Sequence, residues 1–577
     1  MKFDFGDKRE REREREREKI APGLGREASS YTIIISCRIM TGGGEVISVH
    51  VGQCGNQIGR CFWDLALKEH AAYAAEEAAA EARDAHARAR FNSGSRSSSS
   101  SGSASHSLKK TRSKRFCFDG PLNAYFRNVD TRHSPPAEIP LGDGTTPVYA
   151  LRARAILVDT EQGVIGETLK GCGPLGELFD DQQLLYGVSG AGNNFAHGFA
   201  EYGSSYRDEL GDRFRKQAEH CDGMLGFFVT HSLGGGTGSG LGTYILSMLE
   251  DVYPKVLRFS SPVIPTPEDD DVITSPYNAV LAMHQLIEHA DMIFPAENQA
   301  LLGICAKVAK YEAFSSGPRA AGSVTSRLAK QPGAMSGAEK PFDKMNNIVA
   351  HMLANLTAGC RFPGNLNCDL SDLKTNLVPF QGLHYITSSL SPLFSLSDVG
   401  RRESLVRTDQ MFRAAFSRDN QIVKCHGGTS KRYLACALLA RGNVRIGDVD
   451  AAIDKAKGKI LGPHWSDNQV GWKAAVCSAS PVGSENAVLR LANSTGAHAS
   501  LTKMECAFRR LYKRKAHVHH FTQYIEQSQM DDAINRVCEI RDDYLELEGA
   551  QPDTRKLTGY IRSGFPQNPK KLKAVYF

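Results

Sequence analysis

The stretch Gly234-Gly235-Gly236-Thr237-Gly238-Ser239-Gly240 decides the fold of this chain. It follows the apolar run Leu225–Val229, which predicts a buried strand, and it precedes Leu241–Leu246, which predicts the first turns of a helix. Glycines let a backbone approach a ligand closely, and a helix N-terminus offers free N–H groups and a partial positive charge. A strand, a glycine loop and a helix in this order predict a phosphate-binding site.

Two known classes of phosphate loop do not fit this stretch. The Walker pattern requires a lysine after its last glycine, but Leu241 follows Gly240. The dinucleotide pattern requires glycines spaced as G-x-G-x-x-G, and the glycines here are spaced more densely. A flexible glycine linker is a third interpretation, against which the flanking strand and helix argue. The sequence therefore predicts a phosphate loop of another class.

A second strand-to-helix turn lies near the start of the chain. Glu45–Val51 predicts a first strand, and Gly52-Gln53-Cys54-Gly55-Asn56-Gln57-Ile58-Gly59 opens a helix. In an open parallel sheet, ligands bind at the carboxyl ends of the strands. We therefore expect the turns Gly52–Gly55 and Gly234–Gly240 to end neighbouring strands and to aim their backbone N–H groups at one anion.

These two motifs, in this order, resemble those of the tubulin family. Further matches are Ile156–Glu161, Ser189–Asn194 and Arg361–Asn367, and the resemblance covers roughly residues 46–545 apart from insertions. It implies an α/β, tubulin-like fold with a doubly wound parallel-sheet GTP-binding domain, a central helix, a second α/β domain and C-terminal helices. Within the family the resemblance is greatest to the epsilon-tubulins, on the segments Cys61–Leu67, Phe126–Arg132, Asp271–Asn278 and Lys515–His520.

Composition and resemblance together divide the chain into five parts. Residues 1–44 are an extension, dominated by alternating arginine and glutamate, that we expect to be disordered; alternatively, the protein begins at Met40 and the extension is an artefact of the gene model. We expect a GTP-binding domain at 45–298 with an Ala- and Ser-rich insertion at 74–118. An intermediate domain at 299–497 includes the central helix 342–360. The C-terminal helices at 498–550, predicted over about 500–517 and 527–547, and a basic tail at 551–577 follow.

Composition limits the other classes of function. The 577 residues are 41% hydrophobic and 23% charged, which is typical of globular domains, and the formal net charge is +6. The 14 cysteines form no C-x-x-C pair, so we expect reduced thiols in the cytoplasm. The chain has no apolar run long enough to span a membrane and no long basic stripe with interleaved aromatic residues. We therefore expect neither a membrane nor a nucleic acid as partner.

The resemblance implies a GTP site whose residues can be transferred one by one. Gln53 and Cys54 would contact phosphate, and Gln57 would lie near the base. The loop before the second helix would wrap the phosphates, and a third loop would cover the γ-phosphate. The residues of these two loops are Ser232, Gly235, Gly236, Thr237 and Gly238 for the first, and Ala191, Gly192 and Asn193 for the second.

The same resemblance assigns the metal and the nucleoside. Asp159 and Glu161 would hold Mg²⁺ through water, unless they are merely solvated acids at a strand end. Asp271 would bind the ribose, and Asn298 and Asn346 would contact guanine, because an amide offers both a donor and an acceptor. Phe342 would stack on the base, the alternative being ordinary core packing at a helix start.

Hydrolysis of GTP in this family takes place at a site shared between subunits. A loop after the central helix enters the nucleotide site of the next subunit, and here it carries Asp369 and Asp372. Asp372 stands where alpha-tubulin has the glutamate that orients water, so we expect it to be catalytic, with Asp369 nearby. We expect an isolated monomer to be nearly inactive. The alternative is that both residues are surface acids that cap a loop.

The resemblance also implies where the protein acts. We expect a cytoplasmic, cytoskeletal protein of the centriole, basal body and centrosome that organises doublet and triplet microtubules. Other tubulins are the expected partners, delta-tubulin first and alpha- or beta-tubulin next, together with centriolar proteins. A GTP-locked adaptor or cap that never turns over is the first alternative. An ordinary lattice-forming tubulin is less favoured, because Leu393–Val406 departs from the alpha and beta pattern and the tail is basic.

Overall fold

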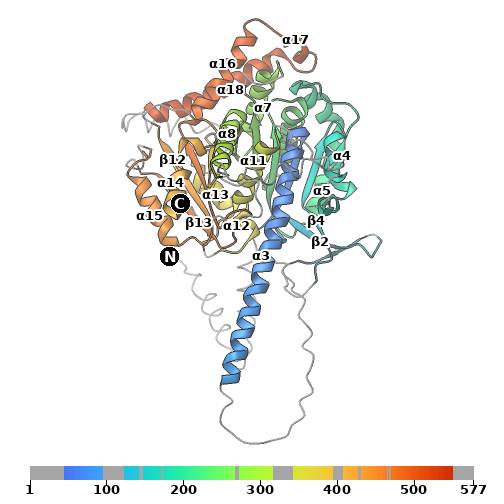
Figure 1. The fold of residues 1–577 in the computed structure, drawn as a ribbon. Helices are drawn as coiled ribbons and strands as arrows, with labels where there is room; N and C mark the ends of the chain where they lie inside the picture. Colours follow the sequence, from blue (N-terminus) through green and yellow to red (C-terminus); the bar gives the residue numbers. More distant parts are fainter. Residues whose placement is uncertain are drawn as a thin grey trace, which may run out of the picture. The chain divides into compact units, whose positions relative to one another are not determined.

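The apolar runs of the first half of the chain form a parallel sheet in the computed structural model (Figure 1). Its strands follow the order β10-β8-β7-β1-β5-β6, and β9 pairs with β8. Every recorded pairing in this sheet is parallel. The strands are β1 Glu45–Val51, β5 Ala155–Asp159, β6 Leu184–Tyr186, β7 Met224–Ser232, β8 Leu257–Ile264, β9 Met292–Ile293 and β10 Ala296–Glu297.

The structure describes residues 44–94, 122–134, 136–141, 147–170, 173–266, 272–315, 342–364, 366–393, 407–425, 431–463, 466 and 469–549. All of them fall within one compact unit that begins at Gly44. The predicted extension before Gly44, most of the predicted insertion, the altered segment after Leu393 and the basic tail lie outside these residues, and so does Asp271.

Helices cover both faces of the parallel sheet. All seven residues of β1 are buried, and Val46 packs in one core cluster while Ile47 and Val49 pack in another, as the alternation of a strand requires. The predicted doubly wound architecture is therefore confirmed. The helices are α3 Gly52–Gly94, α4 Gly163–Lys170, α5 Gly203–Glu219, α6 Gly242–Val252, α7 Ser275–His289 and α8 Asn298–Ser315, with short turns η2 Gly173–Leu178, η3 Asp181–Gln183, η4 His197–Tyr202 and η5 Thr237–Leu241.

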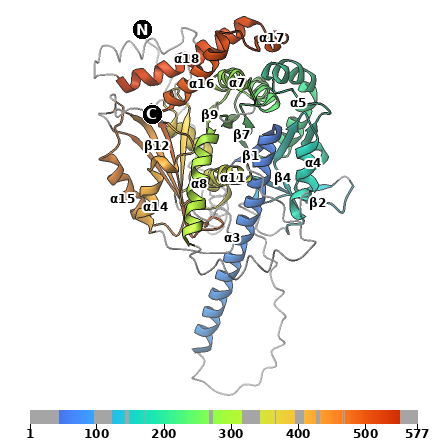
Figure 2. The same cartoon turned by 45° about the horizontal axis from the view of Figure 1, so that its top comes forward.

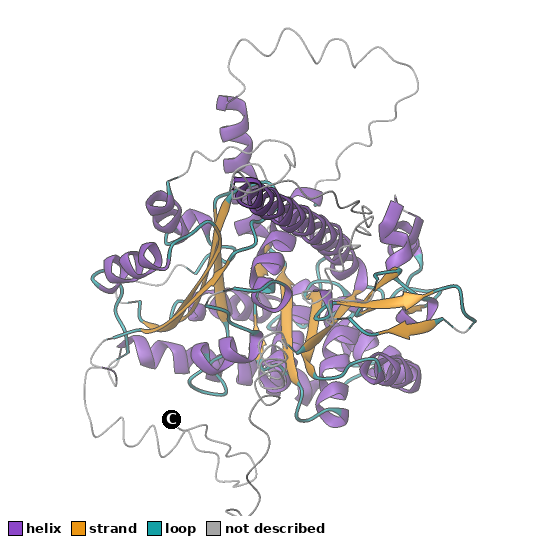
Figure 3. Cartoon of the chain, turned by 90° about the horizontal axis from the view of Figure 1, so that it is seen from below, coloured by secondary structure: helices purple, strands orange, loops and turns teal. Residues whose placement is uncertain are grey.

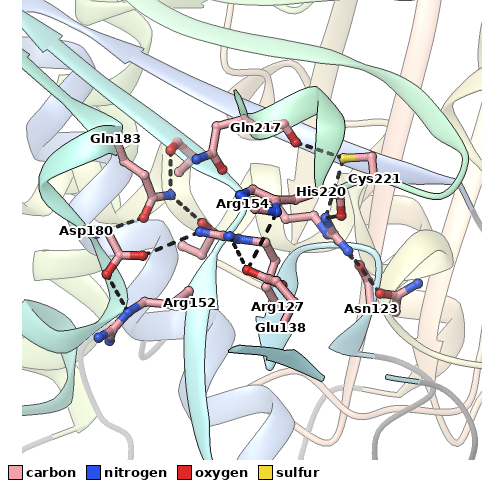
Figure 4. Close-up of polar contacts among 12 residues, drawn as sticks. Asn123, Arg127, Glu138, Arg152, Arg154, Asp180, Gln183, Gln217, His220 and Cys221 are labelled. Atoms are coloured by element: carbon pink, nitrogen blue, oxygen red, sulfur yellow. Dashed lines mark hydrogen bonds and ion pairs between the residues drawn. The ribbon is translucent and has the colours of Figure 1, made fainter. Parts of the chain in front are cut away.

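A small antiparallel sheet is attached to this domain by arginines. Its order is β3-β2-β4, with β2 Phe126–Asp130, β3 Ala137–Ile139 and β4 Ala150–Ala153. The Arg127 guanidinium lies 2.6 Å from Glu138 and 3.5 Å from Asp180, and Arg154 donates to the carbonyl oxygens of Asn123 and His220 (Figure 4). Arg127 thus joins β2 to β3 and to the residue before η3, and Arg154 joins the residue before β5 to the end of α5.

A second, mixed sheet lies on the other side of the central helices (Figure 3). Its order is β11-β14-β12-β13, in which the β12–β13 pair is parallel and the other pairs are antiparallel. One core cluster contains residues of both sheets and of α11, so the two domains share a core. The elements are α11 Asp343–Leu356, α12 Ala358–Arg361, α13 Leu370–Leu377, β11 Ile386–Ser391, α14 Thr408–Ala415, η6 Arg418–Asn420, β12 Tyr433–Gly442, α15 Ile446–Lys457, β13 Gly471–Cys477 and β14 Asn486–Ser494.

The C-terminal helices are α16 Ala497–Tyr512, α17 Val518–Phe521 and α18 Gln527–Gly549. Helices α16 and α18 pack on α7, and Phe521 of α17 contacts Tyr277 of α7 (Figure 2). The sequence predicts a helix over about 500–517, but α16 ends at Tyr512. The reason is local, because Lys515 and His517 have φ angles of 50° and 58°, which a right-handed helix does not accommodate. Among the described residues, no helix is both long and apolar enough to cross a membrane.

Two further helices differ from their predicted bounds. The predicted central helix 342–360 is interrupted at Thr357, which separates α11 from α12. Helix α3 continues without a break through the start of the predicted insertion to Gly94, and its last turns extend beyond the neighbouring elements (Figure 1). The alanine-rich composition of this part of α3 favours a helix even without tertiary packing.

Candidate nucleotide-binding site

The glycine-rich stretch joins β7 to η5 and α6. Strand β7 ends at Ser232, whose Oγ accepts a hydrogen bond from the Gly234 N–H at 3.1 Å. The sequence predicts that the helix begins at Leu241, but helical turns already begin at Thr237. Gly238 and Gly240 are thus helical residues, and a Cβ at Gly240 would lie 2.3 Å from the Phe195 carbonyl oxygen. Close packing, rather than a left-handed backbone, requires glycine here, because no glycine of this stretch has a positive φ.

The first turn lies directly beside the second. Gly52 follows β1 with a φ of +72°, and a Cβ added there would lie 3.1 Å from the Gly238 nitrogen. A Cβ at Gly55 would lie 2.3 Å from the Thr230 carbonyl oxygen. Strands β1 and β7 pair in parallel, so the prediction that these turns end neighbouring strands is confirmed. Gln53, Cys54 and Gln57 follow in the first turns of α3.

A third loop, containing Ala191, Gly192 and Asn193, packs against the glycine stretch. Gly192 and Asn193 both have left-handed backbones, with φ angles of 57° and 53°. A Cβ at Gly236 would lie 2.6 Å from the Asn194 nitrogen and 2.9 Å from the Ala191 carbonyl oxygen. The structure therefore brings all three loops that the sequence assigns to the phosphates to the same side of the sheet, where its strands have their carboxyl ends. We call this side the carboxyl edge and the opposite side the amino edge.

Sequence reasoning missed one residue of this edge. Asn278 of α7 is fully buried and contacts both the third loop and the glycine stretch through its amide. The available signal was a carboxamide within the otherwise apolar run Tyr277–Met283, because a buried amide must find hydrogen-bond partners. Nothing in the sequence alone indicates which partners those are.

The predicted metal residues lie where β5 ends. Asp159 is the last residue of β5 and is buried, and its Oδ1 accepts the Thr160 N–H at 2.8 Å. Burial raises the pKa of this carboxyl to about 6, because no cation of the described chain neutralises it. Glu161 is exposed and lies against Gly190. A buried carboxylate with an exposed one beside it fits Mg²⁺, which prefers oxygen ligands and keeps several waters.

The predicted base-binding residues gather at the beginnings of three helices. The Asn346 amide of α11 donates to Gln57 Oε1 of α3 at 3.3 Å. Asn298 is the first residue of α8, which packs against α11. Phe342 precedes α11 and is 56% exposed, which argues against the alternative that it packs in the core. Asp271 lies outside the described residues.

The shape of the edge fits a nucleoside phosphate. Gly236 and Gly238 are packed against backbone, whereas a Cβ added at Gly192 would meet no atom within 4 Å and one added at Gly235 would meet only the Asn193 amide oxygen at 3.8 Å. Little of the protein therefore packs against these two glycines, and a ligand can approach their backbone closely. The first N–H groups of α3 and η5 have no intrahelical partner and can bind phosphate oxygens.

The two predicted catalytic acids lie at the opposite edge of the sheet. Asp369 Oδ1 accepts the Asp372 N–H at 2.7 Å and so caps the start of α13, while Asp372 itself is exposed. Lys374 of α13 lies 2.6 Å from Asp291, which also accepts the N–H of Arg258 near the start of β8. Helix α13 therefore contacts the amino ends of β8 and β9, whereas the nucleotide loops follow the carboxyl ends of β1, β6 and β7.

Comparison with known proteins agrees with this arrangement. The model of the Tubulin/FtsZ family GTPase domain matches residues 45–306, and that of the Tubulin C-terminal domain matches residues 382–505. The tubulin epsilon chain of Homo sapiens is 42% identical over 516 residues, which cover 88% of this chain and 97% of that protein. The tubulin epsilon chain of Mus musculus is 41% identical over 528 residues, covering 89% and 99%.

A more distant relative shows how far the similarity extends. The tubulin beta chain of Saccharomyces cerevisiae is 29% identical over 530 residues, which cover 91% of this chain and 97% of that protein. Both domain matches lie in this one chain, and each alignment covers nearly the whole length of the relative. This chain belongs to the tubulin family of GTP-binding cytoskeletal proteins.

Proposed function

We propose that this chain acts as an epsilon-tubulin-like protein in the assembly of centrioles and basal bodies, where it organises doublet and triplet microtubules. The similarity to two tubulin epsilon chains over most of the sequence supports this role. Delta-tubulin is the proposed partner, with alpha- and beta-tubulin and centriolar proteins as further partners. The proposed location is accordingly the centriole, the basal body and the centrosome.

The proposed ligand is GTP with Mg²⁺, bound at the carboxyl edge of the parallel sheet. The open faces of Gly192 and Gly235 support a phosphate position between the loops, and the buried Asp159 with the exposed Glu161 supports the metal. The contact between Gln57 and Asn346 supports a base position beside Gln57, where Asn298 and Asn346 would read guanine. The exposed Phe342, which would stack on the base, precedes α11. When bound, Mg²⁺ would neutralise phosphate charge.

The observation that carries the proposed chemistry is the separation of Asp372 from the nucleotide loops of its own chain. Asn346 contacts Gln57 near the start of α3, and Arg361 contacts Glu69 twelve residues further along the same helix. At 1.5 Å per residue these contacts are about 18 Å apart. The segment that carries Asp369 continues from this far end, because Asn367 donates to the Gly359 carbonyl oxygen of α12.

This separation supports the proposal that Asp372 acts on a nucleotide held by another subunit. We propose that it orients the attacking water on GTP of a longitudinal neighbour and that Asp369 holds the helix start in place. Asp372 is one methylene shorter than glutamate, and small displacements from attack geometry cost large factors in rate. Its carboxylate also lies 4.0 Å from the Lys473 ammonium. These features favour slow turnover, and they keep a GTP-locked adaptor or cap as the second candidate.

The nucleotide content of the purified chain tests both candidates. The chain and its Asp372→Ala variant are loaded with GTP and mixed with candidate partner tubulins, and bound GTP and GDP are quantified over time. Asp454→Ala removes an exposed acid of α15 and is the matched control. GDP that forms only with a partner, and only while Asp372 is present, is the expected result. GTP that persists in every mixture would favour the adaptor, and turnover by the isolated chain would contradict the shared site.

A further inference from the structure

Asn278 of α7 connects the third loop to the glycine stretch through its side-chain amide. This residue of α7 is fully buried, and its Oδ1 accepts the Phe195 N–H at 2.9 Å. Its Nδ2 donates to the carbonyl oxygen of Asn193 at 2.8 Å and to that of Gly234 at 2.7 Å. One amide thus binds both loops at once, and it uses both of its donor hydrogens and its acceptor to do so.

The third loop requires such support because its backbone is strained. Gly192 and Asn193 are consecutive residues in the left-handed region, and Asn193 is not a glycine. Conformations of this kind persist only where the surrounding structure holds them. The Asn193 carbonyl oxygen accepts two hydrogen bonds, one from Asn278 Nδ2 of α7 and one at 3.1 Å from Thr274 Oγ1, just before this helix. The start of α7 therefore holds the backbone of Asn193, which is next to the open Gly192.

The contact between the two loops leaves little freedom for adjustment. Gly236 packs on Ala191 and Asn194 so closely that a Cβ would not fit, and Gly235 faces the Asn193 side chain. A shift of either loop would therefore change the shape of the space between them. The Asn278 amide adds a buried group that bonds to both loops.

We propose that Asn278 is a positioning residue that lets the site distinguish GTP from GDP. This inference rests on the proposed function, in which the third loop covers the γ-phosphate and the glycine stretch holds the other phosphates. With the amide in place, both loops bind the triphosphate together. Without it, the third loop relaxes and the contacts to the γ-phosphate are lost, while the contacts of the glycine stretch to the diphosphate remain.

The decisive variant is Asn278→Asp, which keeps the shape of the side chain but replaces both donor hydrogens by an acceptor facing two carbonyl oxygens. The full-length chain, freed of bound nucleotide, is titrated with GTP and with GDP in the presence of Mg²⁺. We expect the dissociation constant for GTP to rise about tenfold or more, as the loss of a buried hydrogen bond requires. We expect the constant for GDP to rise by less than about threefold, since the γ-phosphate is absent.

A matched control separates positioning from general stability. Asn493 of β14 is also fully buried, and its Nδ2 also donates to two carbonyl oxygens, those of Leu377 and Leu383, at 3.0 and 2.6 Å. It lies in the second sheet, away from the three loops. Asn493→Asp should lower the melting temperature as Asn278→Asp does, but it should leave the ratio of the two dissociation constants unchanged.

A milder variant keeps the test decisive if Asn278→Asp does not fold. Thr274→Val removes the second hydrogen bond to the Asn193 carbonyl oxygen from a half-buried position and should shift the ratio in the same direction by about threefold. An unchanged ratio in Thr274→Val and in any folded Asn278 variant would overturn the inference while leaving GTP binding intact. Absence of GTP binding by the unmodified chain would instead overturn the proposed function.

Discussion

At the carboxyl edge of the parallel sheet the contacts are made mainly by backbone atoms, whereas at the amino edge they are made by charged side chains. Gly52, Gly236 and Gly238 pack against the backbone of neighbouring loops at the first edge. At the second edge, Asp291 accepts from the Lys374 ammonium and from the Arg258 N–H. Both edges belong to the same strands, so the difference arises from the residues that follow or precede each strand.

This difference distinguishes nucleotide binding, which one chain can perform, from the proposed hydrolysis, which needs two chains. A backbone cradle is complete within a single chain and suits a ligand that stays bound. The amino edge presents an exposed carboxylate, Asp372, far from the nucleotide loops of the same chain. The comparison therefore predicts that variants at the carboxyl edge change nucleotide affinity, and that variants at the amino edge change turnover or local stability.

The largest expected effect comes from the ion cluster that holds α3 against the second domain. Glu69 of α3 lies 2.6 Å from Arg361 of α12 and 2.8 Å from Arg441 of β12, and all three are buried. Burial alone would raise the pKa of Glu69, but the two arginines outweigh it and lower this pKa to about 2. Glu69→Ala would leave two buried cations facing each other, so we expect it to destabilise the fold by about 3–5 kcal/mol.

Chemical denaturation of the full chain measures this loss. Glu209→Ala, which removes a surface partner of Arg213, is the control and should cost less than about 1 kcal/mol. Equal stability losses for the two variants would show that the cluster does not hold α3 against the second domain. Apolar packing in the core shared with α11 would then have to hold α3 in place.

The second prediction tests the backbone cradle itself. Gly236→Ala would place a Cβ 2.6 Å from the Asn194 nitrogen, so the third loop must move away. We expect GTP affinity to fall about 100-fold, or about 2.7 kcal/mol. Gly211→Ala in α5, where a Cβ would meet no atom within 4 Å, is the control and should leave affinity unchanged while stabilising the helix slightly. Unchanged affinity in Gly236→Ala would mean that the loops do not bind the phosphates.

The third prediction concerns two buried histidines beneath the carboxyl edge. His50 of β1 accepts the Trp63 indole N–H at 3.1 Å, and burial lowers its pKa to about 3. His231 of β7 lies 3.0 Å from the Ser260 hydroxyl, and burial lowers its pKa to about 4. Both pKa values are ordinary, about 6.5, in the unfolded chain. Between about pH 6.5 and 4 the unfolded chain therefore binds protons that the folded chain does not.

The contribution of these two histidines to stability should consequently be fully present above about pH 6.5. As the pH is lowered, the free energy of unfolding should fall by about 1.4 kcal/mol per pH unit for each histidine. Denaturation of the full chain at a series of pH values measures the slope. His50→Gln should reduce the slope by the share of one histidine, and His519→Gln, at an exposed position of α17, is the control. Identical slopes in all three proteins would contradict the assignment of His50 as a buried neutral base.

The carboxyl edge could be predicted from the sequence largely because glycine patterns are local. The strand–turn–helix units at Gly52 and at Gly234–Gly240 were recognisable in single segments, and their neighbouring positions followed from the rules of parallel sheets. The helix start at Thr237 was not predictable, because glycine-rich runs are usually loops. Here the packing of Gly240 against Phe195 overrides that preference.

Contacts between distant segments could not be predicted in the same way. Asn278 joins residues 44 and 85 positions away, and Glu69 pairs with arginines beyond the first domain. A buried amide or carboxylate indicates that partners exist but does not name them. The predictions for residues before Gly44, for Asp271 and for the basic tail remain predictions, because these residues lie outside the described part of the chain.

The smallest expected effect distinguishes the two acids of the amino edge. Asp369 caps α13 by accepting the Asp372 N–H, whereas the exposed Asp372 carboxylate only approaches Lys473 at 4.0 Å. Asp369→Ala should therefore destabilise the fold by about 1 kcal/mol, the usual effect of losing such a cap, and Asp369→Asn should restore most of it. Asp372→Ala should leave stability nearly unchanged and act on turnover in mixed assemblies. If Asp369→Asn folded normally but abolished turnover as completely as Asp372→Ala, the two acids would share the catalytic task, because an amide caps the helix but cannot accept a proton from water.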